Sequence, residues 1–257
     1  MIVGAGRMGK LLAKSLTGLG MTVAVNDSDQ RRGRKIAKTL NIRFKELPTS
    51  IEEEIVIVSV PVEKTVDVCK DLAKRMKMGS LLVDISSVKV GVADKVSSSL
   101  PDGLEYISIH PLFGPSVRSV RGKNFVVVPV RSERWLSKFE KILRDLSGRV
   151  VVTGIQQHDR MMSTVQVLHH FAYLCLATCL SRSELKEEFA TESFMETLRL
   201  LRRIGRNLDV ILSIQRDNPL APIAREQFSR VVEELARSNP EELRRTAREA
   251  FRSPVLA

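Results

Sequence analysis

The stretch Met1-Ile2-Val3-Gly4-Ala5-Gly6-Arg7-Met8-Gly9 decides the fold of this chain. It joins a short apolar run to the spacing G-x-G-x-x-G, and an amphipathic helical pattern follows up to Leu19. At a strand-to-helix turn, the first glycine permits the tight bend, the second lets the backbone meet a pyrophosphate, and the third lets the helix pack on the strand. The free N–H groups at the helix N-terminus favour an anion. The stretch therefore predicts a dinucleotide-binding turn.

A second apolar run, Thr22–Asn26, ends at Asp27. The distance from Gly9 to Asp27 is close to the spacing of about 20 residues expected for the acid that binds the ribose hydroxyls. A carboxylate there repels a 2′-phosphate, so we expect NAD as the cofactor. The arginines at 31, 32 and 34 oppose that preference and keep NADP open. The expected cofactor contacts are Gly4, Gly6, Arg7, Met8, Gly9, Asp27, Val60 and Pro61.

Short apolar runs alternate with helical patterns over residues 1–153. Such alternation, with several strands apolar throughout, is typical of a parallel sheet covered by helices on both faces. The expected strands are Met1–Val3, Thr22–Asn26, Ile55–Val60, Leu81–Ile85, Glu105–Ile109, Phe125–Pro129 and Arg149–Thr153. The helices indicated most clearly are Met8–Leu19, Lys64–Arg75 and Glu133–Leu146.

From residue 154 onward the strand signal ends and helical periodicity continues. We therefore divide the chain into an α/β domain over residues 1–153 and a helical domain over residues 154–257. The expected helices are His158–Leu180, Thr191–Ile214, Leu220–Ser238 and Pro240–Phe251. The first of them is largely apolar, and so short a helical region cannot cover it alone. We expect it to pack against a second copy, which makes the protein a homodimer.

The composition is that of a folded protein suited to anionic ligands. Of 257 residues, 43% are hydrophobic, which argues against disorder. The net charge is +11, and residues 1–180 hold 27 Lys and Arg against 17 Asp and Glu. We do not expect nucleic acid as a partner, because aromatic residues make up only 5% and no helix-turn-helix or zinc-finger pattern is present.

The sequence offers no clear membrane, disulfide or metal signal. No apolar run reaches the length of a bilayer span, and no targeting segment precedes the glycine turn, so we expect a cytoplasmic protein without membrane contact. The three cysteines, Cys69, Cys175 and Cys179, lack C-x-x-C spacing. They are expected to be buried thiols rather than metal ligands.

A candidate catalytic group stands in the segment Ile109-His110-Pro111-Leu112-Phe113-Gly114-Pro115. His110 ends an apolar strand-like run, where a histidine can exchange protons with a bound molecule near neutral pH. The prolines fix the backbone, and Gly114 lets it pass close to a ligand. The alternative is a histidine that merely caps a strand end.

Four motifs, in the same order, resemble those of the prephenate dehydrogenase family of tyrosine biosynthesis, especially its short archaeal members. Asp84–Lys89 matches D-x-x-S-[VI]-K, and His110–Pro115 is similar to H-P-M-F-G-P. The others are Ile57–Pro61, which resembles the fourth-strand signature, and His158-Asp159-Arg160 with Gln166 and His170-Phe171, which resemble the first helix of the dimerisation domain.

The resemblance implies a Rossmann-type, doubly wound parallel sheet followed by an all-α dimerisation domain. It also implies an NAD-dependent oxidative decarboxylation of prephenate to 4-hydroxyphenylpyruvate. In that reaction the cofactor takes a hydride from C4, and carbon dioxide leaves from C1. His110 would accept the hydrogen bond of the 4-hydroxyl, and Ser87 would steady the imidazole. The alternative role for Ser87 is the N-cap of a helix over Val88–Ser98.

The resemblance also places substrate contacts in the helical domain. Arg203 is the first choice for binding a carboxylate, with Arg202 and Arg206 as reserves, although the family's proline is absent at Leu208. His170 and Ser116 complete the expected substrate contacts. His158 is expected to be structural, and Lys89 to add positive potential. The alternative for the three arginines is a solvated helix surface. The alternative for His170 is a histidine packed in the helix core.

Three rival functions remain. Arogenate, which carries an amino group in place of the ketone, would undergo the same chemistry. A β-hydroxyacid dehydrogenase would need a K-x-x-x-N helix, which is missing near residues 157–175. The charge excess keeps open a non-catalytic NAD-binding regulator.

Overall fold

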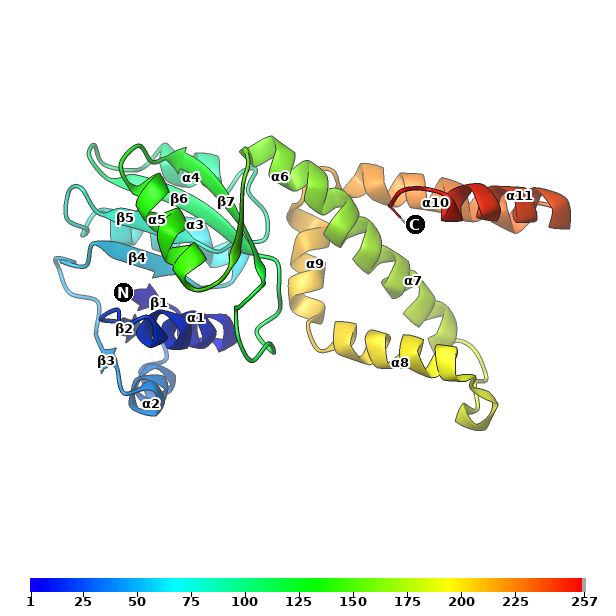
Figure 1. Ribbon diagram of the computed structural model, residues 1–257, viewed down its shortest axis with the longest axis horizontal. Coiled ribbons are helices and arrows are strands. Elements are labelled where there is room, and N and C mark those ends of the chain that lie inside the picture. The colour runs from blue at the N-terminus through cyan, green and yellow to red at the C-terminus, as the bar shows by residue number, and fades with distance from the viewer. Residues whose placement is uncertain (256–257) are drawn as a thin grey trace. The chain divides into compact units, whose positions relative to one another are not determined.

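The structure is a computed structural model that describes residues 1–255, with residue 187 described by its backbone alone. The chain divides into two compact units, Met1–Arg160 and a second that begins at Met161. Figure 1 shows that the first unit is a sheet with flanking helices and that the second is helical. This confirms the predicted fold class.

The first unit is built on one sheet of eight strands in the order β3-β2-β1-β4-β5-β6-β7-β8. All neighbouring strands are parallel except β6 and β7. The chain crosses from the edge strand β3 back to β4 beside β1, and the crevice at such a reversal is where open α/β sheets bind ligands. The strands are β1 (Ile2–Val3), β2 (Ala24–Asn26), β3 (Arg43–Phe44), β4 (Ile55–Val58), β5 (Leu81–Asp84), β6 (Glu105–Pro111), β7 (Asn124–Arg131) and β8 (Arg149–Val152).

Five helices cover the two faces of this sheet. Buried residues of α1, α2 and α5 form one apolar core, and those of α3 and α4 form the other. The central strand β5 is buried on both faces, which explains the apolar run Leu81-Leu82-Val83 that precedes Asp84. The helices are α1 (Arg7–Gly18), α2 (Gln30–Leu40), α3 (Val62–Ala73), α4 (Ala93–Ser97) and α5 (Trp135–Asp145).

Three details of the first unit differ from the sequence-based expectation. The two-residue strand β3 was not predicted, because it is too short to give a periodic signal. The β6–β7 pair is antiparallel, since residues 112–123 form a loop rather than the helical crossover that parallel strands need. The helix over Val88–Ser98, which the alternative N-cap role of Ser87 requires, does not form at that length: α4 begins only at Ala93, because the carboxylate of Asp159 binds the N–H groups of Lys89 and Val90.

The predicted long helix is confirmed; it begins in the first unit, continues into the second and carries a π-helical turn. Helix α6 (Ile155–Met162) runs into a π-helical turn, Ser163–Leu168, and then into α7 (His169–Ser181). The Val167 carbonyl within this turn accepts a hydrogen bond of 2.8 Å from the side-chain amide of Gln215, so the turn belongs to the second unit's small core.

The remaining helices follow with one break that the sequence did not predict. The expected helix Thr191–Ile214 is two helices, because the chain leaves helical geometry around Asn207, whose φ is −123°. The helices Leu220–Ser238 and Pro240–Phe251 are confirmed within one residue. The helices are α8 (Glu192–Gly205), α9 (Leu208–Asp217), α10 (Ala221–Arg237) and α11 (Pro240–Phe251), with a short 3-10 turn at Glu187–Phe189.

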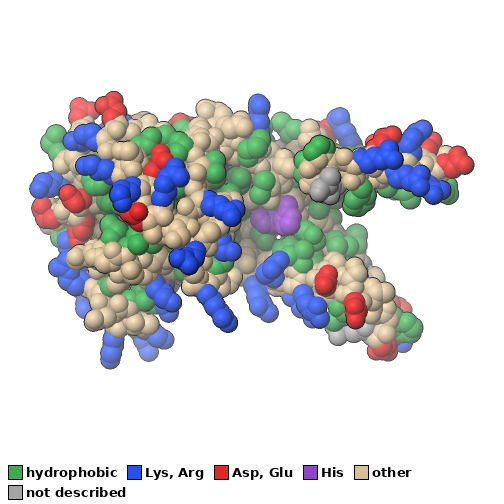
Figure 2. Space-filling view, viewed as in Figure 1, with side chains coloured by type: hydrophobic (Ala, Val, Ile, Leu, Met, Phe, Trp, Pro, Cys, Tyr) green, Lys and Arg blue, Asp and Glu red, His purple; other side chains and the backbone are tan. Residues whose placement is uncertain are grey.

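Surface properties differ between the helices. By length and composition alone, Ile155–Ser181 is apolar enough to cross a membrane, and 6% of its most apolar window is buried. The expectation that no segment is long and apolar enough to span a bilayer is therefore wrong. In Figure 2, Lys and Arg side chains are spread over the visible face of the first unit, and in both units they are mixed with Asp and Glu.

We expect Gly9→Ala to destabilise the first unit by about 1–3 kcal/mol, the usual cost of overpacking. A Cβ at this position would lie 1.9 Å from the carbonyl oxygen of Gly4. Gly18→Ala at the other end of α1 is the matched control, because a Cβ there meets nothing within 4 Å. Helix propensity should make that change neutral or stabilising. Urea unfolding checks the contrast, and equal stabilities would contradict it.

Candidate active site

The glycine turn lies at the carboxyl end of β1. A Cβ atom would clash with backbone atoms at Gly4 and Gly9 but not at Gly6. Gly4 has a φ of +100°, and a Cβ there would lie 2.2 Å from the carbonyl oxygen of Ser59. A Cβ at Gly6 would meet nothing within 4 Å. Gly6 is also the N-cap of α1, with no side-chain capping bond and no acid in the first turn. The turn therefore fits a pyrophosphate at the helix N-terminus.

Asp27 supports this turn from the end of β2. Its carboxylate accepts hydrogen bonds from the N–H groups of Ala5 at 2.7 Å and Asp29 at 2.8 Å. It also accepts two from the Arg32 guanidinium, at 3.0 and 2.7 Å. Burial raises the pKa of Asp27, but the hydrogen bonds from Arg32, Asp29 and Ala5 outweigh that effect and lower the pKa overall. Asp27 is therefore an anion that ties β2 and α2 to the glycine turn.

His110 lies in β6, at the same edge of the sheet, and belongs to a buried chain of three side chains. Its Nδ1 is 2.9 Å from Nε2 of His158, and Nδ1 of His158 is 2.6 Å from Oδ1 of Asp159. We call these three residues the Asp159–His158–His110 relay. The exposed fraction of each residue is 5% or less.

The surroundings of Asp159 set the tautomers of the relay. The carboxylate already accepts hydrogen bonds from the backbone N–H groups of Lys89 and Val90, so it acts as an acceptor toward His158 as well. Neutral His158 then carries its proton on Nδ1 and accepts at Nε2. His110 in turn donates from Nδ1, which places the lone pair of its neutral ring on Nε2. The relay thus prepares His110 to accept a proton.

The charge state of both imidazoles is set mainly by burial. Burial, with smaller contributions from Lys89 and His158, lowers the pKa of His110 well below its usual value. Burial also lowers the pKa of His158, although the hydrogen bond to Asp159 opposes the shift. His110 is therefore neutral at physiological pH, the state required of a general base.

The side chain of Lys89 connects the segment after β5 to the end of β6 through hydrogen bonds. Its side chain is fully buried, and Nζ donates hydrogen bonds of 2.7 Å to the carbonyl oxygens of Ser86 and Ile109. The nearest carboxylate oxygen, Oδ1 of Asp84, is 3.9 Å away. Burial lowers the pKa of Lys89 to about 8, and the charges of Asp84 and Asp159 oppose the shift. Because Ile109 precedes His110, this ammonium group fixes the backbone from which the imidazole projects.

The sequence did not predict the relay. It singled out His110, but treated His158 as structural and offered Ser87 as the partner. Ser87 is half-buried at the end of β5. The signal that was available is the His158-Asp159 pair itself, an imidazole and a carboxylate just before the largely apolar part of the long helix.

The other predicted residues lie in both units. Val60 and Pro61 precede α3, Ser116 is exposed in the loop after β6, and Arg7 and Met8 open α1. In the second unit, His170 lies at the start of α7, and burial, followed by the nearby His169, lowers its pKa to about 4. The exposed arginines Arg202, Arg203 and Arg206 lie at the end of α8.

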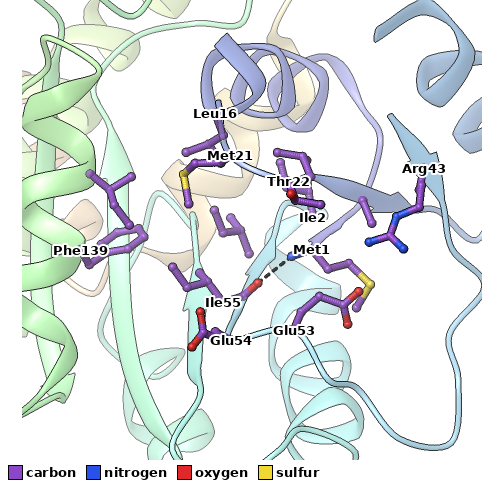
Figure 3. A pocket seen from close by; sticks show the side chains of 14 residues that line it. Met1, Ile2, Leu16, Met21, Thr22, Arg43, Glu53, Glu54, Ile55 and Phe139 are labelled. Carbon is purple, nitrogen blue, oxygen red and sulfur yellow. Dashed lines mark hydrogen bonds between the residues drawn. The ribbon is translucent and has the colours of Figure 1, made fainter. Parts of the chain in front are cut away.

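Among the side chains that the structure describes, no group of three or more His, Cys, Asp or Glu is arranged to hold a metal ion. A pocket at the amino ends of the strands, lined by Met1, Ile55 and Phe139 among others, is shown in Figure 3. It lies at the edge of the sheet opposite the glycine turn, so it is not part of the predicted dinucleotide site.

Two family models match consecutive parts of the chain. The prephenate dehydrogenase nucleotide-binding domain matches residues 12–152, and the prephenate dehydrogenase dimerization domain matches residues 155–252. The chain belongs to the prephenate dehydrogenase family. This confirms the resemblance stated from the sequence motifs, and with it the nucleotide-binding domain and the class of nicotinamide dinucleotide cofactor.

A curated relative that matches most of the chain has a name consistent with this family. The chain is 30% identical over 91% of its length to "Probable arogenate/prephenate dehydrogenase" of Methanocaldococcus jannaschii, and the match spans 55% of that protein. The chain therefore covers about half the length of this relative.

Two solved structures share the fold. The prephenate dehydrogenase from Aquifex aeolicus, solved with hydroxyphenyl propionate and NAD⁺, matches with a TM-score of 0.76 at 21% identity, over 97% of this chain and 92% of that one. Synechocystis arogenate dehydrogenase matches with a TM-score of 0.75 at 16% identity, over 99% and 93%.

We expect the free energy of unfolding to decrease as the pH falls below about 6.5. The pKa values of His110, His158 and His170 are lowered in the folded chain, so the unfolded chain binds more protons between those values and 6.5. Each such group should cost about 1.4 kcal/mol per pH unit in that range. Urea unfolding at several pH values measures the slope.

The combined change His110→Asn and His158→Asn should reduce this slope. Gly18→Ala, which changes no titratable group, is the control and should leave the slope unchanged. A wild-type stability that stays level from pH 7 to about 5 would contradict the assignment.

Proposed function

We propose that this protein catalyses the oxidative decarboxylation of prephenate to 4-hydroxyphenylpyruvate with a nicotinamide dinucleotide. The observation that carries the proposal is the Asp159–His158–His110 relay at the sheet edge that also bears the glycine turn. A buried, neutral imidazole with a fixed tautomer is what the reaction needs at the ring hydroxyl. The family match supports the reaction class, and arogenate is the alternative substrate.

The dinucleotide, when bound, supplies the acceptor for the hydride that leaves C4 of the substrate ring. His110 accepts the hydrogen bond of the 4-hydroxyl as that group becomes more acidic. His158 and Asp159 stabilise the positive charge that develops on the imidazole, in the way a carboxylate supports a catalytic histidine in other enzymes. Lys89 holds the backbone before His110 in place. The loss of carbon dioxide from C1 then leaves an aromatic ring.

The second unit supplies the proposed substrate contacts that the family resemblance indicates. Arg203, with Arg202 and Arg206 beside it, suits a carboxylate because a planar guanidinium can bind it through two hydrogen bonds. His170 is proposed as a further contact, and Ser116 and Ser87 are proposed from the first unit. These assignments rest on the motifs and on residue type.

We also propose that the second unit forms a homodimer. Apolar side chains of the long helix are exposed, including Val165 at 57% and Leu176 at 37%. A second copy of the same helix would cover them, and the matching family model is that of a dimerization domain. We propose a dimer rather than a bilayer contact because the matching family model is that of a dimerization domain. The cytoplasmic location stays a prediction.

We expect His110→Asn to lower kcat by about 10²- to 10⁴-fold, the effect of losing one acid-base partner, with little change in the KM for prephenate. His158→Asn should cause a smaller loss, because the ring of His110 remains but its tautomer is no longer set. The absorbance of the reduced nicotinamide measures turnover of prephenate, and of arogenate in parallel. An unchanged kcat for His110→Asn would refute its role.

We expect light scattering at micromolar concentration to give twice the mass of the chain. Leu176→Glu should shift the protein toward the monomer, because it buries a charge in the proposed interface. Met78→Glu, at an exposed apolar residue of the first unit, is the matched control. A monomeric wild type would overturn the dimer, and detergent-dependent solubility would favour the membrane instead.

A further inference from the structure

The hydrogen bonds of Asp27 have a consequence for the choice of cofactor, which rests on the proposed dinucleotide site. An acid at this position is expected to accept hydrogen bonds from the ribose hydroxyls of NAD. Here the two carboxylate oxygens already accept four N–H donors, from Ala5, Asp29 and Arg32. A carboxylate offers about four lone-pair sites, so its acceptor capacity is filled.

Arg32 also separates Asp27 from any ligand. The side chain of Asp27 is 1% exposed, whereas that of Arg32 is 51% exposed. A ligand that approaches the end of β2 therefore meets the guanidinium before it meets the carboxylate. Arg32 uses Nε–H and one Nη2–H toward Asp27. Three of the five N–H donors of the guanidinium lie outside these two bonds.

We propose that Arg32 binds the 2′-phosphate of NADP, and that this chain binds NADP more tightly than NAD. The guanidinium presents several donors on one plane, which matches the geometry of a phosphate. It also neutralises the carboxylate that would otherwise repel the phosphate. The exposed Ser28, which follows Asp27 directly, adds a hydroxyl donor in the same turn.

The local backbone holds Arg32 in this position. The Oδ1 atom of Asp29 caps α2 by accepting a hydrogen bond of 3.0 Å from the Arg32 N–H. Gly33 lets the helix approach the strand end, because a Cβ there would lie 2.4 Å from the Phe44 ring and 3.2 Å from Cβ of Asp27. The guanidinium is therefore anchored at its backbone and through Asp27 before any ligand arrives, which reduces the entropy lost on binding.

The test compares two small probes, 2′,5′-ADP and 5′-AMP, which differ only in the 2′-phosphate. Calorimetric titration of the full chain should give a dissociation constant about 10- to 100-fold lower for 2′,5′-ADP, the effect of one set of charge-assisted hydrogen bonds. The same order should hold for NADP against NAD. Arg32→Ala should remove this preference without weakening the binding of 5′-AMP.

Arg34→Ala is the matched control, since Arg34 lies on the same helix but pairs with Glu46 and stacks on Phe44. It should keep the preference for 2′,5′-ADP. The proposal is overturned if the wild type binds 5′-AMP as tightly as 2′,5′-ADP, or if Arg32→Ala keeps the preference. If neither probe nor either dinucleotide binds, the proposed dinucleotide site itself is wrong, and the inference falls with it.

Discussion

The hydrogen bonds of the buried Asp159 carboxylate are the interactions on which the candidate active site depends. The carboxylate accepts hydrogen bonds from the backbone N–H groups of Lys89 and Val90 and from the ring of His158. A buried charge is tolerated only when it is paired and fully hydrogen-bonded, and these contacts meet that requirement. They also order the protons along the two imidazoles, so Asp159 sets the tautomer of His110 through His158. The Asp159 carboxylate thereby joins helix α6 to the segment that follows β5.

Asp27 plays the corresponding part at the dinucleotide end of the sheet. It is a second buried carboxylate, and it too is satisfied by backbone N–H groups and by one basic side chain. Its contact with Ala5 holds the glycine turn, and its contact with Arg32 presents a cation to the ligand. In both places a buried carboxylate binds backbone N–H groups of a segment that follows a strand, and it also holds a basic side chain, His158 in one case and Arg32 in the other. The candidate functional groups are therefore positioned by hydrogen bonds to buried carboxylates as well as by the apolar core.

Much of the fold could be predicted from local patterns. The runs that became β4 and β5 are apolar because both faces of the sheet are covered, and the glycine turn has a spacing that few other structures require. The edge strand Arg43–Phe44 escaped prediction because two residues show no periodicity. The direction of β7 and the late start of α4 also escaped. Both depend on partners far away in the sequence, which no local window contains.

The sequence by itself determined the sheet-and-helix class, the family and the dinucleotide turn, and it indicated His110 as a candidate site residue. These follow from residue type and spacing along the chain, which are local properties. Only the tertiary structure decided that His158 and Asp159 stand behind His110, and that Arg32 covers Asp27. The physical reason is that a hydrogen bond depends on the positions of two atoms in space. Residues 110 and 158 lie 48 positions apart, and only the folding of the chain brings their ring nitrogens to 2.9 Å.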